Sequence, residues 1–176
     1  MGKRESGLIP PVSGGISPTL SYRLAEMKSL QCETDCENTL GRVDSVTESD
    51  AALWGRMNVT QMLRHVADAM LVPLGEMHSR VTPTWVGRVI VKPAALKFPL
   101  RWSKGLPTLP EIDQCRLGQP PGDFAEQRDR VRELLAQLRA ANTTGRVHPF
   151  FGPMLTSEWL RWGWLHADHH LRQFGR

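Results

Sequence analysis

The sequence predicts an all-α fold, a single domain in which four long helices form a bundle with one long crossover connection. Several segments repeat apolar residues at three- and four-residue spacing behind residues that cap helices, and no segment shows strand-like alternation of comparable strength. Hydrophobic residues make up 40% and charged residues 23% of the chain, enough for a real core. A Pro- and Gly-rich stretch between two of the helices predicts the crossover.

The N-terminal part divides into a leader and the start of the domain. Residues 1–20 are rich in Gly, Pro and Ser without periodicity, which predicts a flexible leader, and residues 21–176 form the single helical domain. Residues 21–30 are expected to dock on the domain as a short strand or turn. The first helix is predicted from Cys32 to Val43, followed by a loop over 47–56.

The second helix has the strongest start signal. Asn58 suits the N-cap, and Gln61 stands where its side chain can reach back to the cap. Pro73 should kink or end the helix, so we expect it to reach Leu71, with Met77 as its outer limit. The apolar stripe that follows the cap at helical spacing consists of Met62, Val66, Ala69 and Met70.

The middle of the chain is interrupted by prolines. A third helix is predicted from Thr84 to about Ile90 or further, and Pro93 and Pro99 should prevent any long regular element there. Residues 104–122 contain four prolines and three glycines, which predicts a long irregular connection over the surface of the bundle.

The last two long helices begin behind capping residues. Asp123 is the expected cap of one helix, and Thr156 or Ser157 opens the final one, which should run to Phe174 before the terminator Gly175. The apolar stripe behind the first of these caps is Phe124, Val131, Leu134, Leu135 and Leu138.

Charge and cysteine usage argue against several classes of protein. The net charge of +4 comes from scattered Lys and Arg, so a nucleic-acid partner is not expected. No segment reaches the ~20 apolar residues that cross a bilayer, so we expect no membrane partner and a cytoplasmic protein. Three cysteines without an export signal do not make a disulfide framework.

Three histidines predict a metal site. His166 and His170 are four residues apart, so a helix places both imidazoles on one face, and His65 lies within the apolar pattern of the second helix. Three protein ligands would leave a coordination position open. An all-nitrogen site favours zinc or nickel, with iron, manganese or copper as alternatives. The plainer alternative is three core histidines with satisfied hydrogen bonds.

Two residues near these histidines, His169 and Asp68, each have two alternative roles. His169 lies about 60° from His166 on the helix. It is therefore expected to pair with His65 or to stand beside the metal in a cleft. Asp68, one turn after His65, is expected either to accept a hydrogen bond from that imidazole or to be solvated at the surface.

Motifs along the chain give a resemblance to a known group of proteins. The sequence resembles the DinB-like (YfiT-like) superfamily of metal-dependent enzymes, and within it a branch of unknown function. The segments that carry the resemblance are Trp54-Gly55-Arg56-Met57, Gln61-Met62-Leu63-x-His65, Leu106-Pro107-Thr108-Leu109-Pro110, His148-Pro149-Phe150-Phe151-Gly152-Pro153, Ser157-Glu158-Trp159 and His166-x-x-His169-His170-x-x-Gln173-Phe174-Gly175.

The resemblance implies a four-helix bundle of up-down-down-up topology, often a homodimer, with the metal on His65, His166 and His170. It also implies that His148 lies at the rim of the site, where the alternative is an ordinary loop residue. His148 and His169 are therefore the catalytic candidates. Several relatives in the superfamily use the metal to hold a low-molecular-weight thiol, which implies a thiol-dependent transferase acting on a small molecule.

Two alternatives to the transferase stay open. A metal-dependent hydrolase would need a general base, for which the sequence offers Asp68, Glu158 or His169. A non-catalytic bundle that binds a ligand or partner would use its histidines structurally. Its core or interface anchors would be Trp54, Trp159, Trp162 and Trp164.

Overall fold

The computed structural model describes residues 27–98, 101–117 and 120–176, and these are mostly helical, in agreement with the predicted all-α class. The predicted leader over 1–20 and most of the docking segment over 21–30 lie outside the described residues. The helices are α1 (Glu33–Asp44), α2 (Val59–Leu74), α3 (Lys92–Leu96), α4 (Phe124–Ala140) and α5 (Thr156–Gln173), with a π-helical turn η2 (Gly87–Val91) and a 3-10 turn η3 (Pro110–Ile112).

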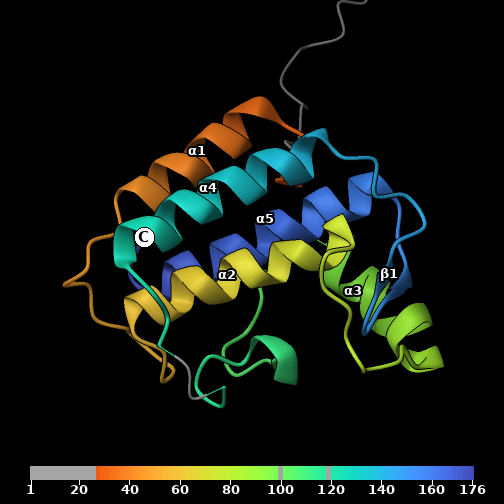
Figure 1. Ribbon diagram of the computed structural model, residues 1–176. Helices are drawn as coiled ribbons and strands as arrows, with labels where there is room; N and C mark the ends of the chain where they lie inside the picture. Colours follow the sequence, from red (N-terminus) through yellow and green to blue (C-terminus); the bar gives the residue numbers. More distant parts are fainter. Residues whose placement is uncertain (1–26, 99–100, 118–119) are drawn as a thin grey trace, which may run out of the picture.

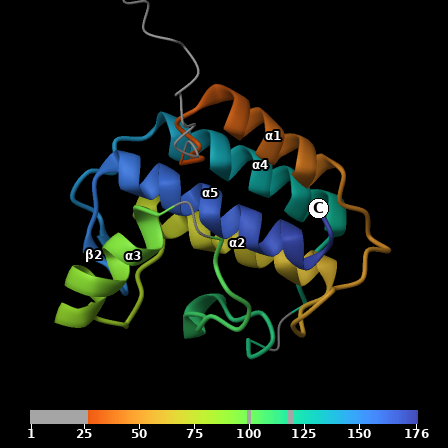
Figure 2. The same ribbon diagram turned by 180° about the vertical axis from the view of Figure 1, so that it is seen from behind.

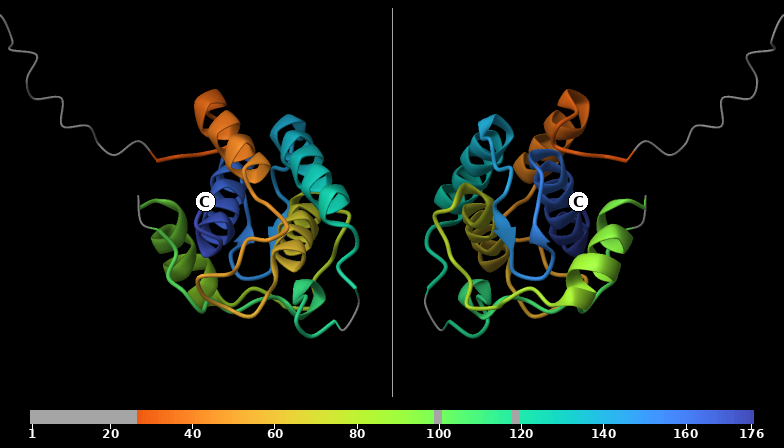
Figure 3. Two further views of the ribbon diagram at one scale, coloured as in Figure 1. Left: turned by 90° about the vertical axis from the view of Figure 1, so that its left-hand side faces the viewer. Right: turned by 90° about the vertical axis from the view of Figure 1, so that its right-hand side faces the viewer.

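Four long helices enclose the core. α2 lies along α4, and α5 packs against both α1 and α2 (Figures 1 and 2). The colours of Figure 1 show that α2 and α4 run in one direction and that α1 and α5 run in the opposite one. Figure 3 shows the two pairs, α1 with α5 and α2 with α4, from the ends of the helices. The fully buried side chains between them include Trp159, Leu30, Met62, Leu63, Met70, Leu135, Leu138 and Leu165.

No helix within the described parts of the chain combines the length and apolar character that crossing a bilayer would require.

The start of α2 is as predicted, and its end lies three residues beyond Leu71 and three residues short of Met77. Asn58 Oδ1 accepts from the Gln61 backbone N–H at 2.8 Å, and Gln61 Oε1 accepts from the Asn58 N–H at 2.9 Å. The helix continues through Pro73 and ends at Leu74, because Gly75 adopts a left-handed conformation with φ +82°. The extension towards Met77 was therefore wrong, since the glycine cap stops the helix first.

The predicted third helix extends past Ile90, within the open end that the sequence allowed. A continuous helical run covers residues 85–96 and includes η2 and α3, so Pro93 does not end it. Pro93 stands in the first turn of α3, directly after the π-helical turn, where the widened ladder tolerates the missing N–H. This run lies at the outer edge of the molecule beside α5 (Figure 1).

A short hairpin that the sequence pattern did not predict joins α4 to α5. Strand β1 (Val147–His148) pairs antiparallel with β2 (Gly152–Pro153), with His148 opposite Gly152. Two-residue strands are too short to show alternation, so periodicity gives no signal for them. The Phe150 carbonyl at the hairpin tip would be 2.1 Å from a Cβ added at Gly87, so only glycine allows the helical run to approach it.

In its described residues, the long connection over 104–122 is irregular as predicted apart from η3, and part of it is buried. It contains η3 and inserts Leu109, Ile112 and Gln114 beneath the surface. The connection therefore contributes to the interior next to α2 rather than only covering it.

Candidate metal centre

Three histidines from two helices meet in the interior. His65 on α2 and His166 and His170 on α5 each offer a ring nitrogen, and these nitrogens lie within 4.8 Å of one another. The ring centroids are 5.1 Å apart for His65 and His166, 4.5 Å for His65 and His170, and 4.8 Å for His166 and His170. The structure thus brings together the three residues predicted from spacing, close enough to bind one metal ion.

Hydrogen bonds fix the orientation of two of these rings. His65 Nδ1 lies 2.8 Å from the Ile112 carbonyl oxygen, which can only accept, so the proton is on Nδ1 and the lone pair is on Nε2. His170 Nδ1 lies 3.1 Å from Gln173 Oε1. The Gln173 amide nitrogen donates to the Trp54 carbonyl at 2.7 Å, which turns its oxygen towards His170. Both imidazoles therefore present Nε2 as a free electron-pair donor.

The third ring of the cluster, His166, has a nitrogen that makes no hydrogen bond to the described residues. Its Nε2 is buried without a hydrogen-bond partner among the described residues. An unsatisfied buried polar atom costs about 1–3 kcal/mol, a cost that a ligand to that atom would remove. Three neutral imidazole nitrogens are a donor set that fits a bound metal ion such as zinc or nickel.

The electrostatics keep all three rings neutral. Burial lowers the pKa of His65, and it holds the pKa values of His166 and His170 well below their ordinary value. Neighbouring histidines lower the latter two pKa values further, because a proton on one ring disfavours a proton on the next. The neutral imidazole is the form that coordinates a metal, so the centre is ready for binding at neutral pH.

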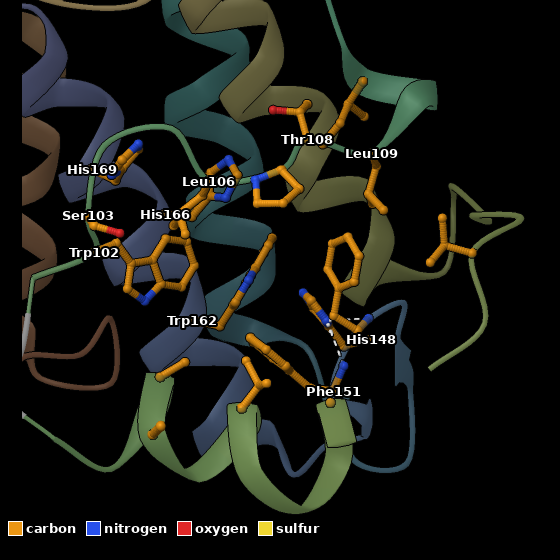
Figure 4. A pocket seen from close by; sticks show the side chains of 18 of the residues that line it. Trp102, Ser103, Leu106, Thr108, Leu109, His148, Phe151, Trp162, His166 and His169 are labelled. Carbon is orange, nitrogen blue, oxygen red and sulfur yellow. Dashed lines mark hydrogen bonds between the residues drawn. The ribbon is translucent and has the colours of Figure 1, made fainter. Parts of the chain in front are cut away.

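A large pocket opens onto the three histidines. Its volume is about 710 Å³, and it is bounded by the helical run, the long connection and the hairpin (Figure 4). His65, His166 and His170 all line it. The three rings therefore face a space where a small molecule can reach the centre.

His148 stands in the wall of this pocket rather than at an exposed rim. Its Nδ1 accepts from the backbone N–H groups of Phe150 and Phe151 at 3.1 and 3.2 Å, so its proton is on Nε2, which can donate. The ring stacks on Phe151 at 4.3 Å, and burial together with the charge of Lys92 lowers its pKa to about 3. Figure 4 shows Trp162 between His148 and His166.

His169 stands beside the three histidines and does not pair with His65. Its ring centroid is 5.0 Å from that of His170, and its other ring neighbours are Trp54 and Trp102. Its Nδ1 is buried without a hydrogen-bond partner among the described residues. Burial lowers the pKa of His169, which favours the neutral imidazole.

Neither role expected for Asp68 is correct. The carboxylate is buried and accepts from Gln114 Nε2 and from Arg130 Nη1, both at 2.9 Å. The Ile112 backbone carbonyl takes the place next to His65 that Asp68 was expected to take. Glu158, another predicted candidate base, accepts from the Leu155 N–H and pairs with Lys92.

Sequence reasoning missed three supports of the site. The Ile112 carbonyl is a backbone group, so no residue type signals it. Gln173 follows His170 by three residues on a helix, and that spacing was a usable signal. Asp168 is buried between Arg42 Nη1 at 2.9 Å and Arg172 Nε at 2.8 Å, and Arg42 lies 126 residues away, too far for any local pattern.

Fold and site together define a helical protein with a buried three-histidine cluster at the end of a large pocket. Residues 25–176 match DUF1569, a family of proteins of unknown function, and the chain belongs to this family. No curated protein and no solved structure matches the chain.

Proposed function

We propose that the chain is a metal-dependent enzyme that transfers a small thiol to an electrophilic substrate. The observation that carries the proposal is the cluster of ring nitrogens from His65, His166 and His170 within 4.8 Å of one another. The buried His166 Nε2, which has no partner among the described residues, supports it. The three rings are neutral and open to a pocket. In the described residues neither His148 nor Asp68 belongs to the cluster, which favours an open coordination position.

The arrangement of the helices supports a DinB-like four-helix bundle of up-down-down-up topology. The chain directions of α1, α2, α4 and α5 in Figure 1 follow that order, and the long connection precedes α4. The metal ligands implied by the resemblance are the same three histidines that meet in the interior. The homodimer that the resemblance also implies stays a prediction.

Three histidines of the chain would hold the metal, and two further groups orient their rings. His65, His166 and His170 would hold zinc or nickel through their Nε2 atoms, and Gln173 and the Ile112 carbonyl orient two of them. When bound, the metal supplies a Lewis acid that lowers the pKa of a thiol at its open position.

The thiol proton and the leaving group need partners of their own. In this proposal His169 receives the thiol proton and His148 donates through Nε2–H to the group that departs, since both side chains line the pocket beside the three histidines. The sulfur forms a bond to the electrophilic carbon as the bond between that carbon and the leaving group breaks. The electron pair of the broken bond goes with the leaving group.

Metal content tests the proposal directly. Protein purified without a metal-affinity tag is expected to contain near-stoichiometric zinc or nickel by mass spectrometry, and His166→Ala and His170→Ala should each lose it. His78→Ala, which changes an exposed histidine outside the cluster, is the matched control and should keep the metal. A wild-type protein that is metal-free and cannot be reloaded would overturn the proposal and favour a non-catalytic bundle.

Gln173→Leu should weaken metal binding by about 10–100-fold, because His170 loses the acceptor that fixes its proton on Nδ1. The affinity is measured by competition with a chromogenic chelator. Gln137→Leu, at an exposed position of α4, is the control and should leave the affinity unchanged. Equal affinities for both variants would mean that Gln173 only fills space.

A further inference from the structure

The helical run over 85–96 exposes an unusual number of apolar side chains. Trp85 is 69% exposed, Ile90 55% and Phe98, just beyond the run, 54%. We call this group the apolar face; it consists of Trp85, Val86, Val89, Ile90, Val91 and Phe98. Apolar side chains gathered on one projecting element, rather than scattered singly, mark a surface that contacts another apolar phase.

Positive charge accompanies the apolar face. The sequence from Trp85 to Pro110 contains five Lys and Arg residues and no Asp or Glu. Lys92 is held by Glu158 and the Pro153 carbonyl, whereas Arg88, Lys97 and Arg101 are exposed. These three residues form a cationic rim, which is complementary to a negatively charged surface.

The same helical run forms one wall of the pocket. Val86, Gly87, Val91 and Ala95 line it, so the pocket is adjacent to the apolar face. Across from them the pocket is lined by aromatic and aliphatic side chains, and Arg101 is the one charged side chain among the described lining residues apart from the neutral histidines. A space of about 710 Å³ with this lining suits an uncharged, lipophilic molecule.

We propose that the apolar face docks on the surface of an anionic phospholipid bilayer and that the pocket takes a lipophilic substrate from it. Trp85 and Ile90 enter the interfacial region while the cationic rim contacts lipid phosphates. Contact with one leaflet needs no spanning helix, so the proposal replaces the expectation of no membrane partner, which was drawn from the missing spanning segment alone. The docking stands by itself, whereas the lipophilic substrate rests on the proposed enzyme function.

A second copy of the chain is a poorer occupant of the same surface. Two-fold symmetry places a patch against itself, which would bring two cationic rims together. Like charges at that distance oppose association, whereas an anionic bilayer attracts them. The charge pattern therefore selects the bilayer.

Sedimentation with vesicles tests the docking on the full chain. Binding to phosphatidylcholine vesicles with about 30% phosphatidylglycerol should exceed binding to pure phosphatidylcholine by about tenfold or more and should fall in high salt. Trp85→Ala should weaken binding to the anionic vesicles by about tenfold, and Lys97→Gln by about fivefold. Leu53→Ala is the matched control, because Leu53 is 68% exposed and does not line the pocket.

The outcomes separate the docking from the enzyme function. His166→Ala should keep vesicle binding after losing metal, and Trp85→Ala should keep metal after losing vesicle binding. Absence of wild-type binding to the anionic vesicles overturns the docking. A dimer that Trp85→Ala converts to a monomer, with no vesicle binding, also overturns it and assigns the face to a second copy.

The substrate class has its own test. The neutral apolar probe N-phenyl-1-naphthylamine should fluoresce on binding the pocket, and Ala95→Trp, which fills the wall shared with the apolar face, should remove most of that signal. A wild-type protein that does not bind the probe would exclude the lipophilic substrate.

Discussion

Metal-free protein is expected to lose stability steeply as the pH falls from about 7 to about 5. The cause is the burial of five histidines, all of whose pKa values lie below their ordinary value in the folded protein. These residues are His65, His148, His166, His169 and His170. The unfolded chain takes up protons on these side chains below about pH 6.5, and the folded chain does not, so acid favours unfolding.

The sign and the size follow from the two pKa values of each histidine. A depressed folded-state pKa gives stability that is complete above the unfolded-state value and is lost as the pH falls towards the folded-state value. For His148, with a pKa of about 3 in the folded protein, the loss by about pH 5 is roughly 2 kcal/mol, or about 5 °C in the melting temperature. The other four histidines act in the same direction, so the total loss is larger.

Thermal unfolding in the presence of a chelator, followed by circular dichroism across this pH range, measures the effect. His148→Asn is the informative variant, because its amide oxygen can replace Nδ1 as the acceptor for Phe150 and Phe151 without titrating. Its melting temperature should depend less on pH than that of the wild type. A wild-type melting temperature that stays constant from about pH 7 to about pH 5 would show that the histidines are hydrated in the free protein.

The sequence was most informative where local patterns determine the structure. The capping pair Asn58 and Gln61 and the apolar stripe behind it predicted the start of α2, and Asp123 predicted that of α4. Spacing of three and four residues on a helix also predicted that His166 and His170 share a face. His65 joined them because it lies mid-helix in an apolar pattern, which predicts an inward direction.

Features that depend on distant parts of the chain were not predictable in this way. The Ile112 carbonyl reaches His65 only because the long connection folds inward, and the tautomer of His148 depends on the hairpin tip. Pro93 predicted a helix end that the preceding π-helical turn avoids. In each case a backbone geometry set by tertiary packing decides the outcome, and the residue types alone do not encode it.

The centre also carries an energetic cost that the rest of the fold must offset. His166 Nε2 and His169 Nδ1 are buried without partners in the described residues, and each such atom costs about 1–3 kcal/mol. Buried titratable groups that lack partners and lower one another's pKa are typical of functional sites, where stability is given up for reactivity. The rest of the fold has to supply the compensation, and the bonds of Asp168 to Arg42 and Arg172 join α5 to α1 within it.

Asp168→Asn is expected to lower the free energy of unfolding by about 3 kcal/mol. The carboxylate is 5% exposed and joins Arg42 of α1 to Arg172 of α5 through bonds of 2.9 and 2.8 Å. An amide keeps the size of the side chain but offers a single uncharged acceptor, which leaves one guanidinium without its partner in a partly buried place. Urea unfolding followed by circular dichroism gives the value.

A control variant shows whether the loss of stability comes from the buried ion pair or from the loss of any one negative charge. Asp129→Asn removes a carboxylate that is 73% exposed beside Arg128, and exposed pairs contribute about 0–1 kcal/mol, so its stability should stay close to that of the wild type. Arg172 also contacts the Trp102 carbonyl at 3.5 Å, and Trp102 lies beside His166 and His169. Asp168→Asn should therefore weaken metal binding as well. If Asp168→Asn and Asp129→Asn have equal free energies of unfolding, α1 and α5 are held together by apolar packing alone.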